Sequence, residues 1–243
     1  TIAEPSSRLF CRRIKGQKFT GIRRRGKYLV FEVADGHTML LHLRMSGRLH
    51  LVSASVPRNK HEHVLFSFDD SRQLRFHDTR KFGRLHLLKD PNRILDRLGP
   101  EPLASGFTAK TLAEGLKRRR RLLKPLLLDQ TFIAGLGNIY VDEALWEAKL
   151  HPCRLAASLS TAEIKVLHRT IRRVLKRGLK NLGTTLGTGN GNFYSVANRR
   201  GRNKDLLRVF RRTDLPCNRC KSPIRRIIVG QRSTHICGKC QKI

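Results

Sequence analysis

Acidic residues are scarce in this sequence. Asp and Glu together number 18 among 243 residues, against 51 Lys and Arg, so the formal net charge is +33 and the sequence pI is near 11.4. A cationic excess of this size indicates a polyanionic partner, because binding neutralises phosphates and releases their counterions. Nucleic acid is the first candidate for that partner, and an anionic membrane surface is the second.

Long hydrophobic runs are missing as well. No apolar stretch approaches the roughly 20 residues that a membrane-spanning helix needs, and no basic amphipathic helix dominates the chain. We therefore expect no membrane partner. The hydrophobic fraction of 39% still allows a folded core, which excludes a disordered basic tail. The length suits two domains and a small appendage.

Cysteine is also infrequent, and four of the six cysteines form two pairs near the end of the chain. Cys217 and Cys220 make one C-x-x-C, and Cys237 and Cys240 make the other after sixteen intervening residues. This spacing predicts one structural Zn²⁺ held by four thiolates. Two disulfides are the alternative, but a C-x-x-C loop is too short for a good structural bridge, and no secretory signal indicates an oxidising compartment.

The residues between the two pairs predict a β-hairpin. A strand over 224–229 is followed by a glycine turn and a second strand that ends near Ile236. Such a small unit cannot bury enough apolar surface to fold alone, so zinc binding would supply its stability. The turn displays Gln231 and Arg232, and an arginine fixed in this way is pre-positioned for a phosphate.

The first part of the chain has the pattern of an antiparallel β-sandwich. Short apolar and β-branched runs recur from Phe19 to Leu88, separated by turn signals such as Asp35-Gly36. Residues 1–7, in contrast, show neither a strand nor a helix start of any strength. We place the end of this domain near residue 102, where the periodicity becomes helical.

The helical part contains a helix, a glycine-bearing turn and a second helix. Residues 126–130 end the first helix, Gly135 and Gly137 make the turn, and the second helix starts near Asn138. This arrangement is typical of DNA-binding motifs, in which Asn138 and free backbone N–H groups can contact a phosphate. The alternative is an ordinary helical hairpin with Asn138 as its N-cap. Residues 160–182 predict a long amphipathic scaffold helix that begins with a capping box.

Six segments taken together resemble formamidopyrimidine-DNA glycosylases. They are Gly26-Lys27-Tyr28, residues 42–47, Asp78-Thr79-Arg80-Lys81-Phe82-Gly83, residues 98–103, residues 135–140 and the terminal C-x-x-C pairs. The resemblance implies an α+β multidomain fold. We expect an antiparallel β-sandwich over 1–102, a helical domain with a helix-two-turn-helix motif over 103–215, and a zinc-finger hairpin over 216–243.

The resemblance also implies a function. The family comprises base-excision repair enzymes that flip an oxidised purine out of duplex DNA, cleave its glycosidic bond and nick the abasic strand. We therefore expect a monomeric, bacterial, cytoplasmic and nucleoid-associated protein whose partner is duplex DNA carrying oxidised bases.

Site residues follow from the same resemblance. Lys27 and His42 are similar to phosphate ligands near the flipped nucleotide, and Asn138 and Arg232 are similar to residues that pinch the backbone there. A second group is similar to the side chains that enter the hole left by the flipped base. This group supplies an apolar wedge, a guanidinium and an inserted ring, from Met45, Arg80 and Phe82 respectively.

The start of the chain departs from the family pattern. The family's chemistry depends on an N-terminal proline amine that attacks the sugar C1′ and on a following glutamate, whereas this sequence begins Thr1-Ile2. We expect no catalytic residue in these 243 residues, with Lys27 only assisting. The chain is then an N-terminally incomplete glycosylase, without the family's opening strand and helix, or an inactive relative. Thr1, Lys27 and Lys124 are the alternative amines for a Schiff base.

Two other functions remain open from the sequence. One is a non-catalytic, zinc-containing protein that binds damaged DNA through the same groove. The other is an endonuclease-VIII-like glycosylase for oxidised pyrimidines, although Met45 with Arg80 and Phe82 favours the purine-directed branch. The segment over 187–212 occupies the region of the family's damaged-base capping loop, and its composition leaves the lesion preference open.

Overall fold

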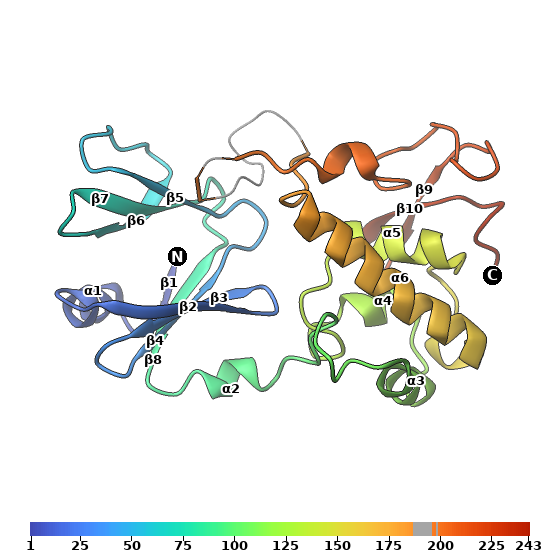
Figure 1. Cartoon of the computed structure of the whole chain (residues 1–243), viewed down its shortest axis with the longest axis horizontal. Coiled ribbons are helices and arrows are strands. Elements are labelled where there is room, and N and C mark those ends of the chain that lie inside the picture. The colour runs from blue at the N-terminus through green and yellow to red at the C-terminus, as the bar shows by residue number, and fades with distance from the viewer. Residues whose placement is uncertain (187–195, 198) are drawn as a thin grey trace. The chain divides into compact units, whose positions relative to one another are not determined.

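The computed structural model describes residues 1–186, 196–197 and 199–243, so residues 189–194 of the expected capping loop lie outside it (Figure 1). The chain forms two compact units. The first comprises residues 1–96 and 181–204, and the second comprises residues 97–180 and 205–243. The helical segment and the terminal hairpin both belong to the second unit. The division into three domains at 102 and 215 stays a prediction.

The first unit contains two β-sheets. A five-stranded sheet has the order β1-β8-β4-β3-β2, and a three-stranded sheet has the order β5-β7-β6. Neighbouring strands are antiparallel, except that β1 and β8 are parallel. The elements are β1 (Ile2–Glu4), α1 (Ser7–Ile14), β2 (Phe19–Arg25), β3 (Tyr28–Val33), β4 (Thr38–His42), β5 (Arg48–Ser53), β6 (Glu62–Ser67), β7 (Arg72–His77), β8 (Arg84–Leu88) and α2 (Asn92–Leu95).

Both sheets contribute to one apolar core, which confirms the predicted sandwich. Met39 and Leu85 from the larger sheet and Leu74 and Phe76 from the smaller sheet are buried in the same cluster. Phe10 of α1 joins this cluster and is almost fully buried. The alternation of inward apolar and outward polar residues therefore fixes which face of each strand is internal.

The prediction for residues 1–7 is wrong. The chain opens with β1, whose Ile2 pairs with Leu85 of β8, and α1 begins at Ser7. Ser6 caps this helix, because its hydroxyl accepts a hydrogen bond from the Leu9 N–H at 3.4 Å. The strand is three residues long and its stability comes from β8, so it leaves no periodic signal in the sequence.

The second unit is helical, with a terminal hairpin. Its elements are α3 (Ala109–Lys117), α4 (Leu123–Leu128), α5 (Asn138–Ala148), η1 (Ala156–Ser158), α6 (Thr161–Lys180), β9 (Arg225–Val229) and β10 (Arg232–Ile236), and the short η2 (Asn203–Leu206) spans the boundary between units. The predicted capping box is present at the start of α6, where Ser160 and Glu163 exchange hydrogen bonds at 2.8 and 3.2 Å. Among the described residues, no helix has both the length and the apolar character to cross a membrane.

Helix α5 is the element to which the C-terminal segment is attached. The buried Glu143 carboxylate accepts backbone hydrogen bonds from Arg208, Val209 and Phe210 at 2.8 to 3.0 Å. Burial raises the pKa of Glu143, although these N–H groups act in the opposite direction. Because a buried carboxylate needs such partners, the chain just before the zinc hairpin is fixed to α5.

A group of histidines lies on the smaller sheet of the first unit. His77 is 2% exposed, and neither of its ring nitrogens has a hydrogen-bond partner in the described structure. The rings of His50 and His61 lie edge-on to it, with centroids 6.1 and 5.6 Å away. Burial and the nearby Arg48 guanidinium lower the pKa of His77 to about 4. The imidazole is therefore neutral in the native protein at neutral pH.

This histidine predicts a loss of stability in acid. The unfolded chain takes up a proton near the ordinary histidine pKa, about 6.5, whereas folded His77 does so only at about 4. Stability should fall as the pH drops through this window, by up to about 3 kcal/mol from His77. Urea titrations at neutral and acidic pH should show a smaller acid loss for His77→Gln than for wild type. Equal losses in wild type and His77→Gln would contradict the assignment.

Candidate nucleic-acid interface

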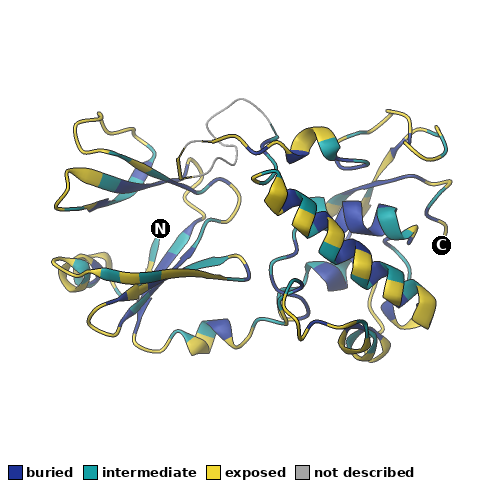
Figure 2. Cartoon of the chain, viewed as in Figure 1, coloured by how far each residue is buried: buried dark blue, intermediate teal, exposed yellow. Residues whose placement is uncertain are grey.

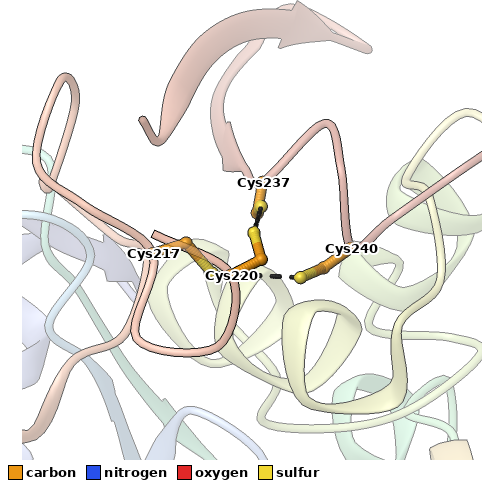
Figure 3. A group of neighbouring side chains, drawn as sticks. All are labelled: Cys217, Cys220, Cys237 and Cys240. Atoms are coloured by element: carbon orange, nitrogen blue, oxygen red, sulfur yellow. Dashed lines mark hydrogen bonds between the residues drawn. The ribbon is translucent and has the colours of Figure 1, made fainter. Parts of the chain in front are cut away.

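The four paired cysteines form one cluster. Their sulfur atoms all lie within 4.8 Å of one another, with Cys217 and Cys240 at 4.0 Å and Cys220 and Cys237 at 3.4 Å (Figure 3). A tetrahedral zinc site with Zn–S bonds of about 2.3 Å has sulfur atoms roughly 3.8 Å apart. All four cysteines are unbridged, which excludes the disulfide alternative. The cluster therefore fits one structural Zn²⁺.

A glutamine supports the second cysteine pair. The Cys237 N–H donates to Gln241 Oε1 at 3.0 Å, and Gln241 Nε2 donates to the Leu150 carbonyl at 2.9 Å. Gln241 is buried, so this amide links the metal-binding loop to the chain just after α5. Groups behind the ligands fix the orientation of the thiolates in this way.

The hairpin turn between β9 and β10 carries Arg232. Gly230 and Gln231 both have positive φ angles, 54° and 60°, and form a two-residue turn between the paired Val229 and Arg232. Two such residues define a type I′ turn, which matches the twist of a hairpin. A Cβ atom on Gly230 would lie 2.8 Å from Pro125 of α4, so the turn also depends on close packing. Arg232 is exposed directly after it.

A buried ion pair joins α4, α5 and β10. Lys124 Nζ donates to Asp142 Oδ1 at 2.5 Å, to Thr234 Oγ1 at 2.8 Å and to the Ser233 carbonyl at 3.1 Å. Both charged side chains are fully buried. Asp142 Oδ2 also accepts the His235 N–H at 2.9 Å. Breaking such a pair leaves an uncompensated buried charge and costs about 3 to 5 kcal/mol.

Lys124 is therefore a structural residue. Burial lowers the pKa of its ammonium, and the Asp142 carboxylate opposes this shift. An amine that is enclosed and ion-paired cannot attack a sugar carbon, so the structure excludes Lys124 as a Schiff-base nucleophile. Nothing in the sequence distinguished this lysine from an exposed one.

Asn138 contacts the zinc hairpin. It is the first residue of α5, and its Nδ2 donates to the Ser233 carbonyl at 2.9 Å. The N-cap of α5 is Gly137, and no side-chain capping bond is present, so the N-cap alternative is wrong. The Ser233 carbonyl thus accepts from both Asn138 and Lys124. Ser233 directly follows Arg232 in the chain, so this hydrogen bond holds the Asn138 amide at the residue next to Arg232.

Lys27 directly precedes β3, and His42 ends the neighbouring strand β4. Gly26, with φ 56°, and Lys27 form the turn between β2 and β3, and Lys27 is exposed. His42 ends β4 opposite Tyr28, whose ring lies edge-on at 4.9 Å. Burial and the cations Arg44 and Lys27 lower the pKa of His42 to about 4. His42 Nδ1 accepts the Arg44 N–H at 3.0 Å, so the neutral ring carries its proton on Nε2, a donor for a phosphate.

A buried aspartate connects the two loops that carry Met45, Arg80 and Phe82. Asp78 is fully buried, and its Oδ1 accepts from Ser46 Oγ at 2.5 Å. Its Oδ2 accepts from the Gly83 N–H at 2.7 Å. Burial acts to raise the pKa of Asp78, but the Ser46, Gly83 and Arg80 donors outweigh it and hold the pKa below its ordinary value. We name this arrangement the Asp78 clasp.

The clasp presents three side chains from its two loops. Met45 adjoins Ser46 and is 66% exposed, and Phe82 lies in the 78–83 loop and is 51% exposed. Arg80 Nε donates to Ser46 Oγ at 3.2 Å, and its guanidinium lies 5.5 Å from the Phe82 ring centroid. The sequence reasoning gave no role to Ser46 or Asp78. A buried carboxylate contacting two separate loops is visible only in three dimensions.

The zinc cluster yields a spectroscopic prediction. Trp146 is the only tryptophan in the sequence, and the Arg219 guanidinium lies 4.0 Å from its ring centroid. Arg219 also donates to the Trp146 carbonyl at 2.6 Å and lies between two zinc ligands. Removing zinc with a chelator should release this arginine and expose the indole, because the hairpin depends on the metal. Tryptophan emission should shift to the red, and Cys237→Ser should show that spectrum without chelator.

Arg219→Gln provides the matched control. It should bind zinc and lose the stacking contact, so its initial emission differs from that of wild type. An emission spectrum of wild type that does not change when zinc leaves would contradict the proposed dependence of the hairpin on zinc.

Three family models cover the chain. They are the formamidopyrimidine-DNA glycosylase N-terminal domain over residues 1–85, its H2TH domain over 98–190, and the zinc finger found in FPG and IleRS over 214–243. A formamidopyrimidine-DNA glycosylase of Protochlamydia amoebophila is 48% identical over 242 residues, which cover 100% of this chain and 88% of that protein. One of Herpetosiphon aurantiacus is 44% identical over 97% of this chain and 86% of the relative.

Solved structures agree with these relatives. The Lactococcus lactis Fpg in complex with DNA containing an abasic site has a TM-score of 0.90 and 37% identity, covering 97% of this chain and 86% of that one. The same enzyme with a Fapy-dG containing DNA has a TM-score of 0.88 and 36% identity over the same shares. The sandwich, the helical motif and the zinc hairpin all find counterparts, and the chain therefore belongs to the formamidopyrimidine-DNA glycosylase family of DNA repair enzymes.

Proposed function

We propose that this protein removes oxidised purines, such as 8-oxoguanine and formamidopyrimidines, from duplex DNA and nicks the abasic site by β,δ-elimination. Related structures of the Lactococcus lactis enzyme hold DNA with a Fapy-dG or an abasic site, which supports the substrate class. We further propose that the protein acts as a monomer in the bacterial cytoplasm. The observation that carries the proposal is the Asp78 clasp with its three exposed side chains.

The clasp suits the extrusion of a base. Flipping a base costs a few kcal/mol of stacking and pairing, and side chains that enter the vacated space offset part of this cost. Met45 and Phe82 are apolar and exposed on the two loops that Asp78 joins, so both side chains are available to be covered by a partner. We assign Met45 as the wedge, Arg80 as the group facing the orphaned base, and Phe82 as the inserted ring. Arg80 is restrained by Ser46, so little conformational entropy is lost on insertion.

Each unit supplies two phosphate ligands in this proposal. In the first unit, the Lys27 ammonium offers a point charge and the neutral His42 offers its Nε2–H. In the second unit, the exposed Arg232 offers a fork of donors, and the Asn138 amide has a second N–H beyond the one bound to Ser233. Within each unit, a neutral donor thus accompanies a cation, His42 with Lys27 in the first and Asn138 with Arg232 in the second.

The chemistry needs an amine that attacks the sugar C1′ as the base leaves. In this proposal, that amine is the N-terminal proline of the family and the following glutamate moves protons, while Lys27 assists. Neither residue is present in the 243 residues, which open with Thr1-Ile2. Lys124 is enclosed, whereas Lys27 is exposed, so we assign the assisting role to Lys27.

Borohydride trapping tests this function. Reduction fixes the Schiff base between an enzyme amine and the sugar, so a covalent adduct reports the chemistry directly. The substrate is a duplex with 8-oxoguanine opposite cytosine, offered to this chain and to a version extended to the natural start codon. We expect an adduct with the extended protein alone. An adduct with the 243-residue chain would mean that Thr1 or a lysine attacks, and no adduct with either protein would favour a non-catalytic damage-binding protein.

The Asp78 clasp predicts a selective defect. Asp78→Asn replaces one acceptor oxygen by an NH₂ group, which cannot accept from Ser46 or Gly83 and leaves a buried group unpaired at about 1 to 3 kcal/mol. Affinity for a duplex with an abasic-site analogue should fall by about tenfold or more, whereas affinity for undamaged duplex should change by less than about twofold. Fluorescence anisotropy with both duplexes measures the two effects.

Asp69→Asn is the matched control, because Asp69 is an exposed carboxylate close to Asp78 in the chain. It makes the same change in charge and should leave both affinities near wild type. If Asp78→Asn weakened both duplexes equally, the clasp would be a general scaffold, and its role in extrusion would be wrong.

A further inference from the structure

The solvent face of α6 carries a row of basic side chains. Lys165, Arg169, Arg173, Lys176 and Lys180 are all exposed and recur every three or four residues, so they lie along one side of the helix. Figure 2 shows exposed residues recurring along the whole length of α6. Arg173 is paired with a carboxylate, Glu147, at 2.7 Å. We call the other four residues the α6 row.

The α6 row lies on the side of the helix opposite its buried face. The opposite side carries buried residues such as Leu167, Ile171 and Gly178, which belong to the inner face. At Gly178 the packing is so close that a Cβ atom would lie 2.3 Å from the Tyr140 hydroxyl of α5. Tyr140 follows Asn138 by two residues. The row is therefore on the other side of α6 from the helix that carries this proposed phosphate ligand.

Carboxylates near α6 do not neutralise the row. Among the described residues, no carboxylate forms an ion pair with any of its four members. Two acids on or beside α6 have other partners, since Glu163 binds Arg154 and the start of α6, and Glu147 binds Arg173 and Arg177. A row of like charges without acids is unfavourable alone and favours binding of an anion.

We propose that the α6 row binds the phosphate backbone of a second segment of duplex DNA. The row spans sixteen residues of helix, a length of about 22 Å, over which a duplex presents about 13 phosphates. An anionic membrane fits less well, because interfacial helices insert an apolar face and that face of α6 is buried in the core. The protein then holds two DNA segments at once, and neither segment needs to contain a damaged base.

Bridging of two duplexes tests the proposal. A long undamaged duplex is immobilised on beads and loaded with protein. The amount of a short, labelled undamaged duplex that the protein retains on the beads is then measured. The quadruple variant Lys165→Gln, Arg169→Gln, Lys176→Gln and Lys180→Gln should lose most of the retained label. The slope of log retention against log salt should flatten by about 3 to 4, since each lost phosphate contact contributes about 0.9. Its affinity for a single duplex with an abasic-site analogue should stay within about twofold of wild type.

A matched variant distinguishes a specific binding site on α6 from a general effect of lower net charge. Arg8→Gln, Arg12→Gln, Lys15→Gln and Lys18→Gln remove the same four charges from exposed positions in and just after α1. This control should retain the label as wild type does. Equal loss in both variants, or no bridging by wild type, would overturn the proposal. The α6 variant could instead bridge as wild type does but lose binding to anionic lipid vesicles. That result would assign the row to a membrane and would also overturn the proposal.

Discussion

One backbone carbonyl, that of Ser233, accepts hydrogen bonds from Lys124 at 3.1 Å and from Asn138 at 2.9 Å. The lysine is buried and balanced by Asp142, so its removal would leave a buried carboxylate without a counter-charge. The pair thereby holds α4, α5 and the zinc hairpin in one arrangement. The location of Arg232 relative to Asn138 follows from this arrangement, because Arg232 directly precedes Ser233 in β10.

The first unit uses the same physical principle with a single carboxylate. Asp78 is buried and receives donors from two loops, so a movement of either loop would break a hydrogen bond to a buried carboxylate. Exposed groups are thus positioned by buried ones: Met45, Arg80 and Phe82 by Asp78, and Asn138 and Arg232 by Lys124 with Asp142. The exposed side chains remain available for a ligand while the buried charges supply the rigidity.

The sequence predicted what depends on local spacing. The zinc ligands follow from two C-x-x-C pairs, the capping box at Ser160 from its Glu163 partner, and the sandwich strands from alternating apolar residues. Contacts between distant residues gave no such signal, since Ser46 and Asp78 are 32 residues apart and Lys124 and Ser233 are 109 apart. Strand β1 was missed because its pairing with β8 stabilises it. The family resemblance supplied the roles proposed for Met45, Arg80 and Phe82, which their exposure alone would not have indicated.

The most direct test of this account is the affinity of Lys124→Met for a duplex with an abasic-site analogue, measured with zinc content and Trp146 emission as controls. Methionine fills a similar volume without the ammonium, so the contact to Ser233 is lost while the cysteine ligands are unchanged. The account predicts a zinc-loaded protein that binds this duplex at least about tenfold more weakly, because Asn138 and Arg232 are no longer held together. A zinc-loaded Lys124→Met protein with wild-type affinity would contradict it.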